Sequence, residues 1–257
     1  MRNKINYRGA YTIFKWQVLR FLKFPTQTLA SPVITTTLYF VVFGYSIGNR
    51  VGEIDGISYI KFIVPGLIMM SLLMNAYTSP SSNILLSKVL NTLVDVLSAP
   101  ISALEFLVAY SLAGAVRGIV VAIVIYIVSL FFAGFTITSW FYLFGFLILT
   151  SWSFAIIGVI AGVWASRFEQ VFLLPTYVIT PLTFLGGVFY SIKMIPPILQ
   201  KVSLFNPIFY MIDGLRYSFY GIYDVPPLRS LIFVFFAWAV LFAIAYHVIS
   251  KGYKLKT

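Results

Sequence analysis

Long apolar runs alternate along the chain with shorter polar stretches. A helix that crosses a bilayer needs about 20 predominantly apolar residues, and six runs approach or exceed that length. They fall near residues 26–47, 62–78, 103–132, 140–164, 171–190 and 232–249. The pattern therefore predicts an all-α membrane protein with six transmembrane helices, forming one transmembrane domain over residues 1–257.

The first 24 residues have a different pattern, with cations and apolar side chains on opposite sides of a helix. At about 100° per residue, Arg8, Lys15, Arg20 and Lys23 fall on one side. Such a helix lies in the membrane surface with its cations toward anionic lipid headgroups. We expect an amphipathic interface helix over residues 1–24.

Residues 79–102 are polar enough to form a loop between the second and third spans. The Ser-Pro-Ser-Ser sequence at its start predicts a turn at Ser79–Ser82. The residues after it predict a helix from Asn83 to Leu97, ended by Pro100. We expect this cytoplasmic helix, residues 83–100, to be long enough to dock on a partner protein.

A long segment with several prolines, residues 191–228, precedes the last span. Phe209, Ile212, Leu215 and Phe219 share one helical face, which would be unfavourable in water. We therefore expect this external segment to re-enter the outer leaflet, with an ordinary external loop as the alternative. On the same helix Asp213 and Arg216 are spaced to pair across one turn.

Two features inside the spans depart from a uniform apolar helix. Pro175 and Pro181 are expected to break the fifth span. Arg117 is the one charge well inside a span, where burial costs at least about 2.5 kcal/mol. Either its side chain reaches the cytoplasmic surface, or it points into a helix interface or polar cavity. The second alternative is supported by Gly114 and Gly118, which allow close helix approach.

The composition excludes a soluble globular domain. Hydrophobic residues make up 60% of the chain, charged residues 10%, and the mean hydropathy is +0.95. The net charge of +11 could suggest nucleic acid, but cytoplasmic loops of membrane proteins collect Lys and Arg. With the termini placed in the cytoplasm, eleven cations fall in inner segments and six in outer segments, so we predict that both termini are cytoplasmic. We predict membrane lipids as a partner, and no nucleic acid.

The sequence offers little catalytic chemistry. It has no cysteine and one histidine, and the Walker A pattern is missing. A G-x-S-x-G motif surrounds Ser46, but the motif and His247 belong to opposite ends of different spans. We therefore expect no catalytic residue, no metal ligand and no cofactor on this chain, and a protein that is not itself an enzyme.

All seven acidic residues fall in loops or at span edges. Ion-coupled pumps usually need a carboxylate or histidine relay inside the membrane. Energy for uphill transport would therefore come from another subunit. The alternative is an ion-coupled secondary transporter or channel that acts without an ATPase.

Three ordered motifs carry a resemblance to a known family. The first occupies residues 181–222 and contains Gly186-Gly187-Val188-Phe189, Pro196-Pro197, Asn206-Pro207 and Asp213-Gly214-Leu215-Arg216. The second is Phe62–Ser71 and the third is Asp95–Pro100. Together they resemble the ABC-2-type permeases, the membrane subunits of type-2 ABC exporters, and within them the YadH-like branch. That family more often has Glu where this chain has Asp95.

The resemblance implies a bacterial inner-membrane protein with both termini in the cytoplasm. It implies a homodimeric permease that forms the translocation path and works with two copies of a cytoplasmic ABC ATPase, on which ATP and magnesium are bound. The substrate would be a lipid, a glycan or an amphipathic drug-like molecule.

The resemblance also assigns roles to residues of this chain. Coupling to the ATPase is expected at Lys88, Asp95, Leu97, Pro100 and Glu105. The outer gate and re-entrant segment are expected to involve Gly186, Gly187, Pro196, Pro197, Asn206, Pro207, Asp213 and Arg216.

Overall fold

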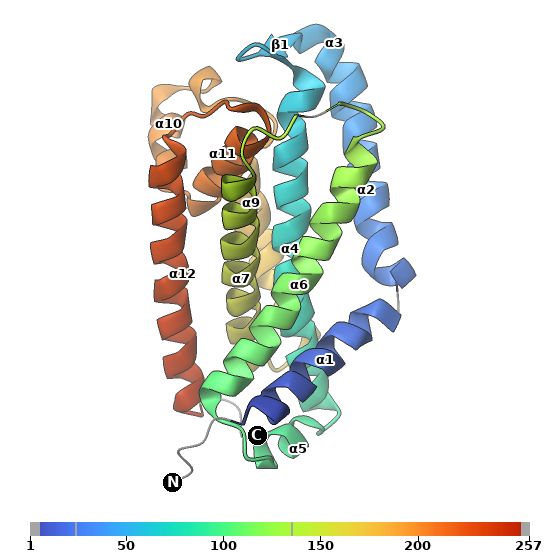
Figure 1. Cartoon of the computed structure of the whole chain (residues 1–257), viewed down its shortest axis with the longest axis vertical. Coiled ribbons are helices and arrows are strands. Elements are labelled where there is room, and N and C mark those ends of the chain that lie inside the picture. The colour runs from blue at the N-terminus through green and yellow to red at the C-terminus, as the bar shows by residue number, and fades with distance from the viewer. Residues whose placement is uncertain (1–5, 24, 135, 253–257) are drawn as a thin grey trace.

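The computed structural model describes residues 6–23, 25–134 and 136–252, which fold into a bundle of helices elongated along one axis (Figure 1). Its first half contains α1 (Tyr7–Lys23), η1 (Thr26–Ala30), α2 (Ser31–Tyr39), η2 (Phe40–Ile47), α3 (Gly48–Val51), β1 (Glu53–Ile54), β2 (Ile57–Ser58), α4 (Tyr59–Val89), α5 (Leu93–Ser98) and α6 (Ala103–Ser129). Its second half contains α7 (Trp140–Trp164), α8 (Phe168–Leu174), η3 (Pro175–Ile179), α9 (Thr180–Leu185), η4 (Ile192–Met194), α10 (Pro197–Leu204), α11 (Pro207–Tyr220) and α12 (Pro227–Ser250).

Six helical stretches in the described part of the chain are long and apolar enough to cross a membrane. They are Thr28–Ile47, Tyr59–Val89, Ala103–Ser129, Trp140–Trp164, Phe168–Leu185 and Pro227–Ser250. The prediction of six spans is confirmed. The predicted interface helix corresponds to α1, although residues 1–5 and 24 of that prediction lie outside the described residues.

The two ends of the bundle carry different elements. The short antiparallel pair β1–β2, with Glu53 opposite Ser58, lies at one end together with α10 and α11 (Figure 1). The helices α1 and α5 and the last turns of α12 lie at the other end (Figure 1). With α5 and the C-terminal end of α12 predicted to be cytoplasmic, we call the first end outer and the second end inner.

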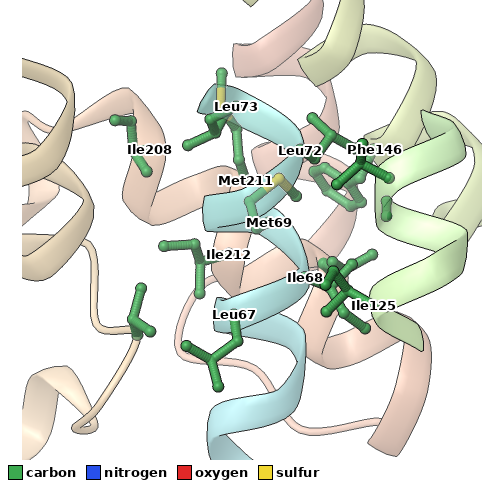
Figure 2. Close-up of a cluster of buried hydrophobic side chains, with 14 of the residues drawn as sticks. Leu67, Ile68, Met69, Leu72, Leu73, Ile125, Phe146, Ile208, Met211 and Ile212 are labelled. Atoms are coloured by element: carbon green, nitrogen blue, oxygen red, sulfur yellow. The ribbon is translucent and has the colours of Figure 1, made fainter. Parts of the chain in front are cut away.

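The second span, α4, forms the centre of the bundle. In the most apolar stretch of α4, 72% of the residues are buried. The corresponding share is 17% for the first and last spans and 22% for the fifth. Figure 2 shows Leu67 and Leu72 on α4, with Ile212 of α11 on one side of this helix and Ile125 of α6 on the other. The core is therefore built around α4, while the first, fifth and sixth spans bury few of their residues.

The predicted turn at Ser79–Ser82 is wrong, because α4 continues through Pro80 to Val89. Pro80 is buried. A Cβ added to Gly114 on α6 or to Gly158 on α7 would lie 2.8 Å from the ring of Pro80. The hydroxyl of Ser81 donates to the carbonyl of Tyr77. Tight packing thus holds a local turn sequence in a helix. The predicted helix over residues 83–100 is divided into the end of α4 and the short α5.

The sequence predicted that Pro175 and Pro181 break the fifth span. The structure shows that they do not. The span is helical from Phe168 to Leu185, and the stretch Pro175–Ile179 widens into a π-helix. Such wide turns are one of the ways in which a helix accommodates a disrupted hydrogen-bond ladder. The hydroxyl of Thr180 donates to the carbonyl of Pro175, which supplies part of the lost bonding.

The third span packs closely against α4 through glycines, as the sequence indicated. A Cβ added to Gly118 would lie 2.8 Å from the Cβ of Ala76 and 3.1 Å from the carbonyl oxygen of Leu72. The helix α6 ends at Ser129 rather than at residue 132, and it crosses the bundle at an angle to α7 and α12 (Figure 1). Its length is accommodated by this tilt.

Candidate functional site

The outer-end motif residues converge on α11. Asn206 caps this helix by accepting a hydrogen bond from the N–H of Ile208, and its amide also donates to the carbonyl of Leu182 on α9. Pro207 occupies the first helical position, which suits its missing N–H. These contacts attach the start of α11 to the outer end of the fifth span.

Arg216 is a buried cation held by groups from two other elements. Its side chain is 2% exposed, and its Nη2 donates to the carbonyl of Gly187 at 2.7 Å. Its guanidinium carbon lies 3.8 Å from the centre of the Phe62 ring on α4, a geometry that stabilises a cation. One side chain therefore joins α11 to the ends of the second and fifth spans.

Gly186 and Gly187 terminate α9 beside this arginine. Gly187 has φ +79°, a conformation that favours glycine. A Cβ on Gly186 would lie 3.0 Å from Ile212 of α11. Their observed role is a tight turn and a close helix approach, and their predicted role in an outer gate stays a prediction.

Asp213 does not form an ion pair with Arg216, so the pairing suggested by their spacing is not observed. Its two carboxylate oxygens accept the backbone N–H groups of Asp224 and Val225 at 2.9 and 3.0 Å. Burial raises the pKa of Asp213 to about 6, in opposition to these hydrogen bonds, which lower it. The residue thus fastens the loop after α11 to the helix.

A surface lysine that the sequence analysis did not identify completes this outer cluster. The ammonium of Lys193 lies 3.1 Å from Asp224 and 3.5 Å from Asp55, which belongs to the turn between β1 and β2. The hydrogen bond to Asp224 raises the pKa of Lys193. No local pattern connects these residues, because they are far apart in the sequence.

The apolar face predicted on α11 exists, but protein buries it. Phe209, Ile212, Leu215 and Phe219 are at most 2% exposed, and α11 packs against α4, α7 and α12. The exposed apolar residues of this region belong instead to α10, which begins at Pro196 and Pro197. There Ile198 is 77% exposed, and Phe205 after the helix is 86% exposed.

At the inner end, α5 and the residues that end α4 present apolar side chains outward around an acid. Val89, Leu90, Val94 and Leu97 are exposed, and Asp95 is exposed among them. These residues lie at the end of the bundle predicted to face the cytoplasm (Figure 1). An exposed apolar cluster with a charge in an aqueous compartment is typical of a protein-docking surface.

The other predicted coupling residues are engaged within the chain. Glu105 is buried, and its carboxylate accepts the backbone N–H groups of Ser102 and Asn6. The carbonyl of Pro100 accepts the side-chain amide of Asn6. Lys88 donates to the carbonyls of Val163 and Ala165 at the end of α7. These contacts position α5, and of the three residues only Pro100 is itself exposed.

The helix α1 packs along the inner part of α6 (Figure 1). Arg8, Lys15 and Lys23 are exposed and Arg20 is partly exposed, while Phe21 is buried. The cations therefore remain accessible, as an interface helix requires. Contact with a membrane surface stays a prediction.

Arg117 on α6 points toward α4. Its Nη2 lies 3.5 Å from Oδ1 of Asn75, and its Nε is buried without a hydrogen-bond partner. This contact favours a position at the helix interface over one at the cytoplasmic surface. Asn75 was missed by the sequence analysis, because a lone amide in an apolar run has no partner that can be read from spacing.

Asn75 belongs to a polar face of α4 whose spacing could have been noticed. Ser71, Asn75, Thr78 and Ser82 recur every three or four residues, so they share one side of the helix. All four are partly exposed. A cavity of about 190 Å³ adjoins this face, with Ser31 and other residues of α2 forming its opposite wall.

Comparison with known proteins gives a consistent result. The family described as ABC-2 type transporter matches residues 9–220. The inner membrane transport permease YadH of Escherichia coli (strain K12) is 43% identical over 238 residues, which cover 93% of this chain and 91% of that permease. Nodulation protein J of Rhizobium leguminosarum bv. viciae is 28% identical over 206 residues, covering 75% of this chain and 73% of that protein.

Proposed function

The chain belongs to the ABC-2 type transporter family, and from this premise we propose how it works as the membrane subunit of an ABC exporter. Two copies form the translocation path in the inner membrane, and two copies of a separate cytoplasmic ATPase drive it. ATP and magnesium bind to that ATPase. Both termini lie in the cytoplasm.

The exposed surface of α5 is the observation that carries this proposal. Its aliphatic side chains and Asp95 lie at the end of the bundle that also holds α1 and the last turns of α12 (Figure 1). A docked protein would remove these apolar groups from water, at about 25 cal/mol per Å². The helix α5 is joined by short connections to the second span before it and to the third span after it. A movement of α5 therefore moves the ends of both spans, and through them the translocation path.

The distribution of burial supports a dimer. The first and fifth spans bury only 17% and 22% of their most apolar stretches in one chain, and the polar face of α4 adjoins the first span. A second copy placed against the first and fifth spans would enclose that polar face between the two subunits. The exposed apolar residues of α10 then re-enter the outer leaflet.

The substrate class follows from a path with both polar and apolar walls. Hydroxyl and amide groups on α2 and α4 adjoin methionine and leucine side chains in the same cavity. Such a lining suits an amphiphile such as a lipid, a glycolipid or an amphipathic drug. The alternative, an ion-coupled transporter, lacks support because all seven carboxylates lie near the ends of the bundle or in its loops.

Copurification tests the docking surface. The tagged chain, extracted in mild detergent, should carry an ATPase whose hydrolysis is measured directly. Leu97→Asp should remove that ATPase, because a charge replaces an apolar contact, and Asp95→Ala should retain it but uncouple hydrolysis from transport. Leu130→Asp, at a residue of similar exposure at the opposite end, is the control. Full ATPase retention by Leu97→Asp would contradict the proposal.

A further inference from the structure

We propose that Arg117 binds the acidic headgroup of an amphiphilic ligand inside the bundle. This inference rests on the proposed function, since it names the chemical class that the path recognises. It is carried by the position of Arg117 in the middle of α6, by the lack of a counter-charge among the described residues, and by a cavity with polar and apolar walls beside its partner Asn75.

Arg117 lies near the middle of its helix. Arg117 is 14 residues from Ala103 and 12 from Ser129 in α6, or about 21 Å and 18 Å at about 1.5 Å per residue. Asn75 likewise divides α4 into nearly equal parts. A cation at this depth is costly unless an anion or several hydrogen-bond acceptors compensate it.

The residues that the structure describes do not provide that compensation. Arg117 has one contact, at 3.5 Å from Asn75, and its buried Nε has no partner. Among the residues that the structure describes, no carboxylate forms an ion pair with it. Glu105, on the same helix, is 12 residues or about 18 Å away, and it is occupied by Ser102 and Asn6.

A second copy of the chain does not supply a counter-charge for Arg117 either. Its sequence is identical, so its seven carboxylates occupy the same end positions. The missing negative charge must therefore come from another molecule. A guanidinium presents a planar fork of donors that matches a carboxylate or a phosphate in two parallel hydrogen bonds.

The cavity between α2 and α4 offers that molecule a place next to Asn75, the hydrogen-bond partner of Arg117; Arg117 itself is not among the residues that line it. Asn75 lines the cavity and is also the contact of Arg117. Thr36 and Ser71, whose hydroxyls lie 3.2 Å apart, line the same space. Met70 and Met74 are the apolar part of its wall. Polar groups thus adjoin the headgroup position, and flexible apolar side chains adjoin the chain of the ligand.

Binding by the purified chain tests the inference without any ATPase. The protein is placed in nanodiscs of phosphatidylcholine and titrated with fluorescent lysophosphatidic acid, which has an acyl chain and a phosphate monoester. The matched monoacylglycerol has the same chain without the phosphate. We expect the phosphate compound to bind at least about tenfold more tightly, a ratio equivalent to about 1.4 kcal/mol.

Variants assign this preference to Arg117. Arg117→Gln should abolish the preference for the phosphate compound, whereas Arg117→Lys should keep part of it because the charge remains. Arg50→Gln, which removes an exposed cation at the outer end, should leave it unchanged. A fatty acid in place of the phosphate distinguishes general acid recognition from phosphate recognition. Displacement by inorganic phosphate alone would identify a free-anion site and overturn the amphiphile assignment.

The inference fails if Arg117→Gln binds lysophosphatidic acid as the wild type does, or if the monoacylglycerol binds equally well. That failure is separable from failure of the proposed function. Loss of ATPase copurification with unchanged binding would contradict the exporter assignment alone, and unchanged ATPase coupling without phosphate preference would contradict the Arg117 assignment alone.

Discussion

Two arginines inside the same bundle differ in their surroundings, although the Nε of each is buried without a hydrogen-bond partner. Arg216, near the outer end, donates to Gly187, stacks on Phe62 and is 2% exposed. Arg117, near the middle of α6, has a single long contact with Asn75. Arg216 is buried, whereas Arg117 is only partly buried. We infer from this difference that a cation inside the bundle can stabilise the fold or bind a ligand, and that its partners among the described residues distinguish the two roles.

The largest expected effect is on the stability supplied by Arg216. Arg216→Gln should lower the free energy of unfolding by about 2–3 kcal/mol, because a buried charge-assisted hydrogen bond and a cation–π contact are lost. Thermal unfolding in detergent measures this, with exposed Arg50→Gln as the control. If Arg216→Gln were as stable as the control, the claim that Arg216 stabilises the fold would be wrong.

The pH dependence of unfolding gives a second test of the buried residues on α11, through Asp213. Burial raises the pKa of Asp213 from 3.8 to about 6, so its neutral form is favoured in the folded state. The stability from this group is fully present below pH 3.8 and is lost as the pH rises through about 6, by on the order of 3 kcal/mol. Asp213→Asn should flatten this part of the stability profile. Asp95→Asn, at an exposed acid, should retain the wild-type profile.

If Arg117 serves a ligand, its substitution should have only a small effect on stability. Arg117→Gln should change the free energy of unfolding by less than about 1 kcal/mol in either direction, because it removes an uncompensated charge together with one weak contact. The same unfolding assay applies, without added amphiphile. A loss as large as that of Arg216→Gln would show that both arginines are structural.

The smallest effect is expected at the outer ion pairs. The side chain of Lys193 is 60% exposed, so Lys193→Gln should cost less than about 1 kcal/mol. Unfolding at low salt and at ~1 M salt, where screening is strong, should show the difference only at low salt. A salt-independent loss would indicate that Lys193 has a packing role beyond its charge.

Much of this architecture could be predicted from the sequence. Hydropathy located six spans because the bilayer requires long apolar runs, and the ordered motifs placed Gly187, Asn206 and Arg216 in one region. The error at Ser79–Ser82 has a physical cause, since close contact of Pro80 with glycines of two other helices overrides local turn propensity.

Contacts between distant residues could not be predicted in this way. Phe62 lies under Arg216, and Lys193 joins Asp55 to Asp224, across large separations in the sequence. The partner of Arg117 was equally hidden, although the spacing of polar residues on α4 was a usable signal. Burial also separated Glu105 from the exposed coupling surface, a distinction that residue type does not reveal.

Transport into inside-out membrane vesicles tests the central claim most directly. The vesicles contain the chain with its ATPase, and uptake of fluorescent lysophosphatidic acid is measured with ATP and then with an ion gradient alone. We predict uptake that requires ATP and is abolished by Leu97→Asp. Accumulation driven by the ion gradient without ATP, and unaffected by Leu97→Asp, would contradict the account.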